Sequence, residues 1–289
     1  MLNKRLLNPQ QIPRLLISSL VIIFAFFFPV SIGIADDYSD ALEFYKNKDY
    51  ERAINSFKKG AIRGDADSQS NLGFMYSKGL GVPRDPKAAL NWYEKAAAQG
   101  HSRAQYNAGV MYERGQGVVK DYTRAISYYI KAATKGLSSA QHNLGVMYDL
   151  GKGVPQDYKH AASWYSKAAK QGNADSQFTL GLMYSKGDGL PKDDKHAVFW
   201  YTKAASQRSL PNPFNEMIVV GPSLAQYNLG FMYFRGQGVA KDYIEAHKWW
   251  SLAAANGEDK AVKNVLVVEK ILTREQILES RRRASLWPN

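Results

Sequence analysis

The feature that most constrains the fold of this chain is a unit of 36 residues that recurs in register. Each copy carries a triplet ending in Gly, a Gly-x-Gly pair, an aspartate, an aromatic pair and an Ala-Ala pair, which Lys precedes in the first four copies. The Gly of the triplet stands at Gly73, Gly109, Gly145 and Gly181, and again at Gly230 after a longer interval. A period of this length is typical of stacked helical hairpins, because a single hairpin cannot bury its apolar face alone.

The first full copy predicts two helices joined by a tight turn. Apolar residues at helical spacing indicate a first helix over about residues 66–77. Gly79 and Gly81 then supply backbone that can turn with a positive φ angle. Asp85 followed by Pro86 is typical of the N-cap and first turn of a second helix.

The Gly inside the predicted first helix needs a separate explanation. A glycine there costs about 1 kcal/mol relative to alanine, yet it recurs in all five full copies, beginning with Gly73. We therefore expect an aromatic ring of a neighbouring helix to lie against the backbone at this position.

The N-terminal segment differs from the repeats. Three basic residues precede a run from Leu15 to Phe28 that is apolar except for two serines, and small residues stand at Gly33 and Ala35. This order predicts a secretory signal peptide over residues 1–35, cleaved after Ala35. The alternative is an uncleaved membrane anchor, because the segment from Leu15 to Ile34 is long enough to span a bilayer.

The rest of the chain divides into three predicted parts. Residues 36–65 match the second half of the unit without its Gly-x-Gly pair, so we expect a degenerate first repeat with a shorter connection. Five full repeats follow over residues 66–257, interrupted by an insertion at 208–220. Residues 258–289 are expected to form capping helices, in which Thr273 and Gln276 suggest a capping box.

The recurring pattern A-x-x-x-L-G-x-x-Y-x-x-G-x-G-V-x-x-D-x-x-x-A-x-x-W-Y-x-K-A-A-x-x-G resembles the Sel-one-like repeat (SLR) family, a relative of the tetratricopeptide repeats. The resemblance covers residues 66–257, and residues 36–65 look more like a tetratricopeptide repeat. It implies an all-α, right-handed superhelical solenoid of helix-turn-helix repeats that serves as a protein-interaction scaffold. Bacterial members with signal peptides are typically periplasmic or secreted, so we expect a place in the cell envelope or the secreted space.

By similarity to tetratricopeptide repeats, the first helix of each pair should line a concave groove. The residue two before the recurring Gly is an amide in four copies, and an amide can donate to and accept from a peptide backbone. The residue before it is aromatic or His in four copies. The predicted partner-binding residues are Asn71, Asn107, Asn143, Asn228, Tyr106, His142, Phe178 and Tyr227, with Thr179 replacing the amide in one copy. The alternative is that the Asn row ties helices together and that the aromatic residues belong to the core between repeats.

Two further rows and the insertion bear on partners. A Gln recurs without exception, so we interpret it as structural: Gln69, Gln105, Gln141, Gln177 and Gln226. Basic residues near the ends of the first helices should favour acidic partners: Lys78, Arg114, Lys186 and Arg235. The insertion at 208–220 is either an apolar partner site or a loop folded onto its own repeats.

The sequence offers little to support catalysis. It contains no Cys, which excludes thiol chemistry and zinc sites that need Cys. Only His160 and His196 share a repeat position, which is a weak case for a metal site. Ser56 begins a lone S-x-x-K without the partner motifs of penicillin-binding enzymes. We therefore predict no catalytic residue, no metal and no cofactor.

The predicted partner is a protein or peptide. The basic residues, although in excess with a net charge of +12, are spread over the repeats and do not indicate nucleic acid. Membrane contact is expected only if residues 1–35 stay attached, and the oligomeric state is left open. The alternative function is an envelope enzyme that acts on peptidoglycan or β-lactams.

Overall fold

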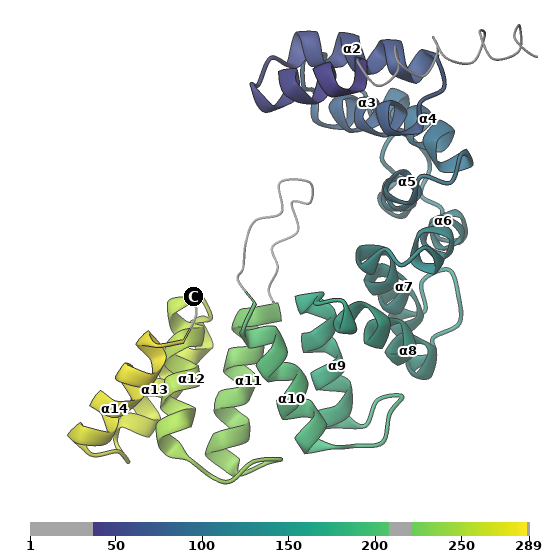
Figure 1. The fold of residues 1–289 in the computed structure, drawn as a ribbon. Helices are drawn as coiled ribbons and strands as arrows, with labels where there is room; N and C mark the ends of the chain where they lie inside the picture. The colour runs from purple at the N-terminus through teal and green to yellow at the C-terminus, as the bar shows by residue number, and fades with distance from the viewer. Residues whose placement is uncertain (1–36, 208–220, 288–289) are drawn as a thin grey trace, which may run out of the picture. The chain divides into compact units, whose positions relative to one another are not determined.

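The computed structural model describes residues 37–207 and 221–287, and within them the chain forms helices joined by short connections, without a strand (Figure 1). The predicted signal peptide at 1–35 and the insertion at 208–220 lie outside the described residues. No helix among the described residues combines the length and the apolar character that crossing a membrane requires.

The chain divides into two compact units between His101 and Ser102. In the first unit, a helix over residues 37–46 and α2 (Tyr50–Ile62) form the first hairpin. Its connection spans residues 47–49, shorter than the 79–85 connection of the next hairpin, as the missing Gly-x-Gly pair predicts. Helix α2 packs on α3 (Ala66–Lys78), which pairs with α4 (Pro86–Ala98).

The second unit stacks four more hairpins and two further helices in chain order. They are α5 (Ser102–Arg114) with α6 (Tyr122–Thr134), α7 (Ser138–Leu150) with α8 (Tyr158–Lys170), α9 (Ala174–Lys186) with α10 (Asp194–Ala205), α11 (Gly221–Arg235) with α12 (Tyr243–Ala255), and then α13 (Asp259–Glu269) and α14 (Arg274–Ser285). Within this unit the second helix of each hairpin packs on the helix that follows it, and both α13 and α14 pack on α12.

Each second helix from α4 to α12 begins at an aspartate N-cap. The carboxylates of Asp85, Asp121, Asp157, Asp193 and Asp242 accept hydrogen bonds from backbone N–H groups in the first turn. Such a bond satisfies a donor that the helix itself leaves unpaired. Asp85 with Pro86 in the first turn confirms the prediction from the sequence.

The glycine pair in each connection has two distinct roles. Gly79 ends α3 in the left-handed region (φ 73°) and donates its N–H to the Met75 carbonyl oxygen at 2.8 Å. Gly81, also at positive φ (69°), lies so close to the carbonyl of Tyr50 that a Cβ there would collide with it. The second glycine therefore fits the connection against the start of the preceding hairpin's second helix.

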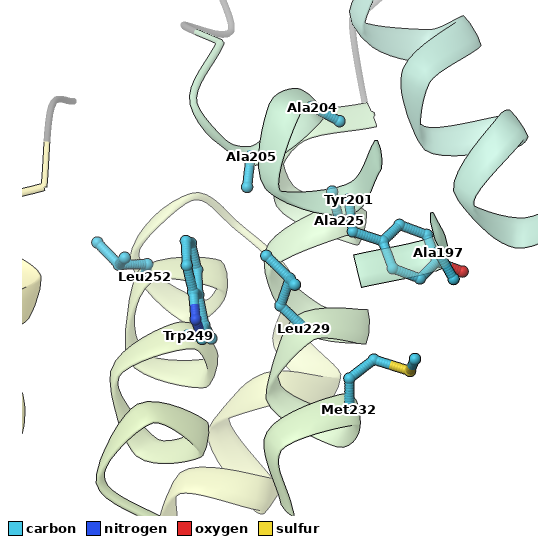
Figure 2. Packing of buried hydrophobic residues seen from close by; sticks show 9 residues of the cluster. All are labelled: Ala197, Tyr201, Ala204, Ala205, Ala225, Leu229, Met232, Trp249 and Leu252. Carbon is cyan, nitrogen blue, oxygen red and sulfur yellow. The ribbon is translucent and has the colours of Figure 1, made fainter. Parts of the chain in front are cut away.

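The core consists mostly of alanine, with one or two large rings in each hairpin. Figure 2 shows such a cluster where α10, α11 and α12 meet, with Ala197, Leu229 and Trp249 among its residues. Small alanines let the helices approach closely, and the buried Tyr201 fills the remaining volume.

The C-terminal helices carry their own signals. Thr273 accepts from the Gln276 backbone N–H while the Gln276 side chain accepts from the Thr273 N–H, which confirms the predicted capping box. Helix α14 then packs on α12, with the Trp249 and Trp287 ring centroids 4.7 Å apart.

Candidate protein-interaction face

The recurring glycines allow each first helix to pack closely against the second helix of its hairpin. A Cβ on Gly109, Gly145 or Gly181 would lie 2.7 Å from a ring carbon of the tyrosine on the second helix of the same hairpin. The corresponding distance for Gly73 and Tyr93 is 2.8 Å. Real side chains do not reach so near an aromatic carbon, so the ring requires glycine. This confirms the expected contact between an aromatic ring and the helix backbone.

The hydroxyl groups of these tyrosines connect neighbouring hairpins. Tyr129 donates to Glu113 Oε2 at 2.6 Å and accepts from Asn143 Nδ2 at 3.1 Å. Burial, followed by the nearby Glu113 carboxylate, raises the pKa of Tyr129 far above its ordinary value. The hydroxyl thus stays protonated and joins α5, α6 and α7 in one network.

The other members of the Asn row are also half-buried. Asn228 stands at the same repeat position relative to Tyr201 as Asn143 does to Tyr129, and its side chain opposes the rise that burial causes in the Tyr201 pKa. Asn71 donates to the Asp67 carbonyl oxygen at 2.9 Å and to the Tyr38 hydroxyl at 3.4 Å. Thr179 instead donates to the Asp175 carbonyl of its own helix at 2.8 Å.

Asn107 is half-buried on α5 at the same repeat position as Asn143. The row therefore combines inter-hairpin or local hydrogen bonds with partial exposure to solvent. Its use by a partner stays a prediction.

Most of the predicted aromatic row lies at the seam between the two helices of a hairpin, and Tyr227 packs within its own helix. Tyr106 packs on Tyr129 with ring centroids 5.8 Å apart, and Phe178 packs on Tyr201 at 5.9 Å. Tyr227 meets Phe231 edge-on at 5.0 Å. These three residues of the row are half-buried.

His142 occupies the same row and adds a hydrogen bond to the next hairpin. Its ring lies 5.5 Å from that of Tyr165, and its Nδ1 is 2.8 Å from the Ser176 hydroxyl oxygen on α9. Burial lowers the pKa of His142, against an opposing effect of Asp175. The neutral imidazole is therefore favoured at neutral pH.

Two carboxylates that the sequence argument did not name belong to this face. Glu113 and Asp149 stand four residues after the recurring Gly, one pitch apart, and accept from Tyr129 and Tyr165. Burial raises the pKa of Asp149, and the Asp188 charge adds to this effect. The signal in the sequence was variation at a fixed position, since other copies carry Ser or Phe there.

The Gln row is structural, as predicted. Gln69 and Gln141 donate Nε2 to the carbonyl oxygens of Ala61 and Ala133, both at 3.1 Å. Gln177 and Gln226 make the corresponding bonds to Ala169 and Ala205 at 3.0 and 3.4 Å. These bonds satisfy carbonyl groups at the ends of buried helices, which burial without a partner would penalise.

The predicted cations lie in the last turn of the first helices. Arg114, Lys186 and Arg235 are exposed, and Lys78 is half-buried. The guanidinium of Arg235 lies 5.5 Å from the Phe231 ring centroid. The positive edge expected from the sequence is thus present along this end of the second unit's first helices.

The histidine residues that share a repeat position are N-terminal helix residues. The Nδ1 atoms of His160 and His196 lie 2.7 Å from the N-cap carboxylates of Asp157 and Asp193. Among residues 37–207 and 221–287, no group of three or more His, Asp and Glu side chains could hold a metal ion.

One Ser–His–carboxylate arrangement occurs at the C-terminal end. His247 Nδ1 lies 2.8 Å from Ser280 Oγ, and its Nε2 lies 3.2 Å from Glu269 Oε1. Ser280 is wholly buried, so no substrate can reach its hydroxyl in this arrangement. The three residues come from α12, α13 and α14 and join these helices.

These features define a class: an all-α solenoid of helix-turn-helix repeats whose first helices carry a half-buried polar and aromatic row. The Sel1 repeat family matches residues 66–101, 102–137, 138–173, 174–209 and 223–258. The chain belongs to the Sel1 repeat family. Proteins of this family are generally non-catalytic scaffolds and commonly mediate protein–protein interaction.

Solved structures that are similar to this chain include the following three. A Sel1 repeat protein from Oxalobacter formigenes is 33% identical over 80% of this chain and 86% of that chain, with a TM-score of 0.69. The protective antigen c5321 of uropathogenic Escherichia coli, which displays an SLR fold, is 27% identical over 88% and 68%, with a TM-score of 0.35. A Sel1 repeat protein from Klebsiella pneumoniae subsp. pneumoniae is 23% identical over 75% and 99%, with a TM-score of 0.44. No curated protein matches this chain.

Proposed function

We propose that this protein is a non-catalytic adaptor of the cell envelope or the secreted space that binds a protein or peptide along its first helices. The carrying observation is the network around Asn143. Its amide is held by Tyr129, which is itself held by Glu113, so polar groups at a half-buried surface are fixed before any partner arrives. Pre-organised groups lose little entropy on binding, which favours recognition.

The composition of this face suggests the chemistry of the partner. The half-buried rings, including Tyr106 and Phe178, offer anchors for apolar side chains, and the amides suit an extended main chain. The exposed Arg114, Lys186 and Arg235 at the helix ends favour carboxylates along one edge. We propose a partner segment with apolar residues and flanking acidic residues.

Site-specific photo-crosslinking in the producing cells tests this assignment. A photoreactive residue replaces Val146, which is half-buried on α7 directly after the recurring Gly145. The matched control replaces Ser163, which is exposed on α8 of the same hairpin. We expect an adduct of defined mass from position 146 and none from position 163.

Binding of the captured protein to the purified chain is the second measurement. This protein should bind the purified chain, and Tyr106→Ala should weaken that binding, because the half-buried ring is lost. Since Tyr106 also packs on Tyr129, far-UV circular dichroism must show unchanged helicity. Adducts from position 163 alone would place the partner on the second helices and contradict the proposal.

Export is a separate part of the proposal. It rests on the sequence of residues 1–35, with its basic start, apolar run and small residues before the proposed cleavage after Ala35. Mass analysis of the chain from envelope fractions checks it. A mature N-terminus at Asp36 supports cleavage, and an intact N-terminus supports the membrane anchor instead.

A further inference from the structure

The outer surface of the C-terminal helices is unusually apolar. Of the twelve large apolar side chains that are exposed in the described residues, six lie between Val262 and Leu286. Three of them are on α13, where Val262, Leu266 and Val267 are 47%, 57% and 52% exposed. The end of a repeat stack needs a polar outer face to remain soluble alone, so this surface is suited to an interface.

The buried residues of α13 determine which side of the helix faces solvent. Ala261 and Val268 point at α12 and are wholly buried. At 100° per residue, Leu266 falls on the opposite side of the helix, and Val262 and Val267 flank it on either side. The apolar stripe is surrounded by charged residues that are exposed with it: Asp259, Lys263 and Lys270.

The order of these residues is complementary to itself when read backwards. In an antiparallel pair of α13 helices centred between Asn264 and Val265, Asp259 would face Lys270 and Val262 would face Val267. In the same register, Lys263 would lay its aliphatic stem over Leu266. A two-fold axis makes each of these contacts twice.

A parallel pair lacks this complementarity. It would place Lys260 against Lys260 and Lys263 against Lys263, and like charges repel at such contacts. The antiparallel pair also opposes the two helix dipoles, which favours it further.

From this placement we propose that two copies of the chain associate through α13, antiparallel about a two-fold axis, with Val262, Leu266 and Val267 at the centre of the interface. The surface is distinct from the first-helix face assigned to a partner above. The proposal is therefore independent of that function.

Cysteine crosslinking tests the register, because the full chain contains no Cys and has no background. Val262→Cys and Val267→Cys are prepared as separate full-length chains, mixed in the same detergent and oxidised. We expect the mixed 262–267 dimer to form faster than the 262–262 and 267–267 dimers. The control Leu150→Cys, of similar exposure at 55%, should stay uncrosslinked.

Charge exchange provides the second measurement, by sedimentation velocity. Asp259→Lys and Lys270→Asp should each raise the dimer dissociation constant by about tenfold or more, because each brings like charges together. Mixing the two variants should restore association, since both of these contacts in the mixed dimer then join a basic residue to an acidic one. Far-UV circular dichroism should be unchanged, because these positions are exposed.

Three outcomes overturn the proposal. The first is a wild-type chain that stays monomeric at its solubility limit. The second is a dominant 262–262 crosslink, which would indicate parallel pairing. The third is a dimer that persists unchanged in Leu266→Glu, which would place self-association elsewhere in the chain.

Discussion

At the residue scale, the buried Tyr129 and Tyr165 each meet two requirements at once. The ring of Tyr165 lies against the backbone of Gly145, while its hydroxyl donates to Asp149 Oδ2 at 3.3 Å. One side chain therefore sets both the approach of the two helices and the position of a carboxylate at the surface.

Gly145→Ala should destabilise the protein. The new Cβ would lie 2.7 Å from the Tyr165 ring, and over-packing of this kind costs about 1–3 kcal/mol. This exceeds the gain of about 1 kcal/mol in helix propensity. Urea unfolding followed by circular dichroism measures the change.

The double variant Gly145→Ala/Tyr165→Leu controls for the ring contact. If the collision with the ring is the cause, the Gly145→Ala substitution should cost less free energy of unfolding when residue 165 is already Leu. An equal cost in both backgrounds would show that the glycine is needed for another reason.

Asp149→Asn should stabilise the folded state at neutral pH. Burial raises the pKa of Asp149, so folding is penalised once the carboxyl ionises. The stability from this group is full below its unfolded pKa and falls as pH rises through the higher folded pKa. Asn keeps the oxygen that accepts from Tyr165, so urea unfolding measured across this pH range should show no such decline in the variant.

Asp157 provides a control of opposite sign. Its pKa is lowered, first by the backbone N–H of His160 and then by the His160 side chain. The stability it supplies is present above its unfolded pKa and is lost as pH falls through the lowered folded pKa. Asp157→Asn should therefore weaken the protein at neutral pH, and equal behaviour of the two variants would refute the assignment.

At the scale of the element, each hairpin could be derived from a few residues. The pairs Gly79 with Gly81 and Asp85 with Pro86 have local effects on φ angles and caps, so the sequence sufficed to predict both helices. The expected end near residue 77 differs by one residue from the observed Lys78. The left-handed Gly79 ends the helix there.

The contacts of the Asn row could not be chosen from the sequence. Whether Asn143 faces a partner or ties the stack depends on where the preceding hairpin places Tyr129, which is a matter of tertiary packing. Asn143 is hydrogen-bonded to that hairpin and is also half-buried, with part of its surface in solvent. Repetition alone identified the position but could not separate the two alternatives.

Thr273→Ala should loosen α14 without unfolding the stack. Loss of the capping box removes the hydroxyl that accepts from the Gln276 N–H, at a cost of about 1 kcal/mol. Hydrogen exchange should accelerate in α14 and remain unchanged in α7. The comparison variant Thr273→Ser should behave as the wild type, and uniform acceleration would contradict a local role.

At the scale of the whole molecule, contacts run between successive hairpins of each unit. The Gln side chains show this order, since Gln141 reaches back to Ala133 and receives Gln171 Nε2 on its own Oε1 at 2.7 Å. Stability in such a stack is approximately a sum of repeat and neighbour terms.

Deletion of residues 138–173 should leave a folded, shorter stack. Residue 174 occupies the repeat position of Ser138, so α9 would meet α6 as α7 does now, with Gln177 replacing Gln141 against Ala133. In circular dichroism, the total helical signal should decrease by the contribution of one hairpin. In urea unfolding, the slope of the unfolding free energy against urea concentration should decrease, because less surface is exposed on unfolding.

The control deletion removes only residues 138–155, which contain α7 and most of its connection. It would place α8 after α6, two second helices in succession without the glycine that seats the ring. We expect larger destabilisation from this smaller deletion. Comparable stability of the two deletions would show that register is unimportant.

The second glycine of each connection affects how the number of repeats can change in the gene. Gly153 and Gly189 pack against the first residues of α6 and α8. Each of these repeats therefore contacts the preceding repeat in the same way. An unequal crossover between two copies in the gene preserves that contact whenever a whole period is gained or lost. The number of repeats, and with it the length of the surface that the first helices present, can thus change in a single recombination event.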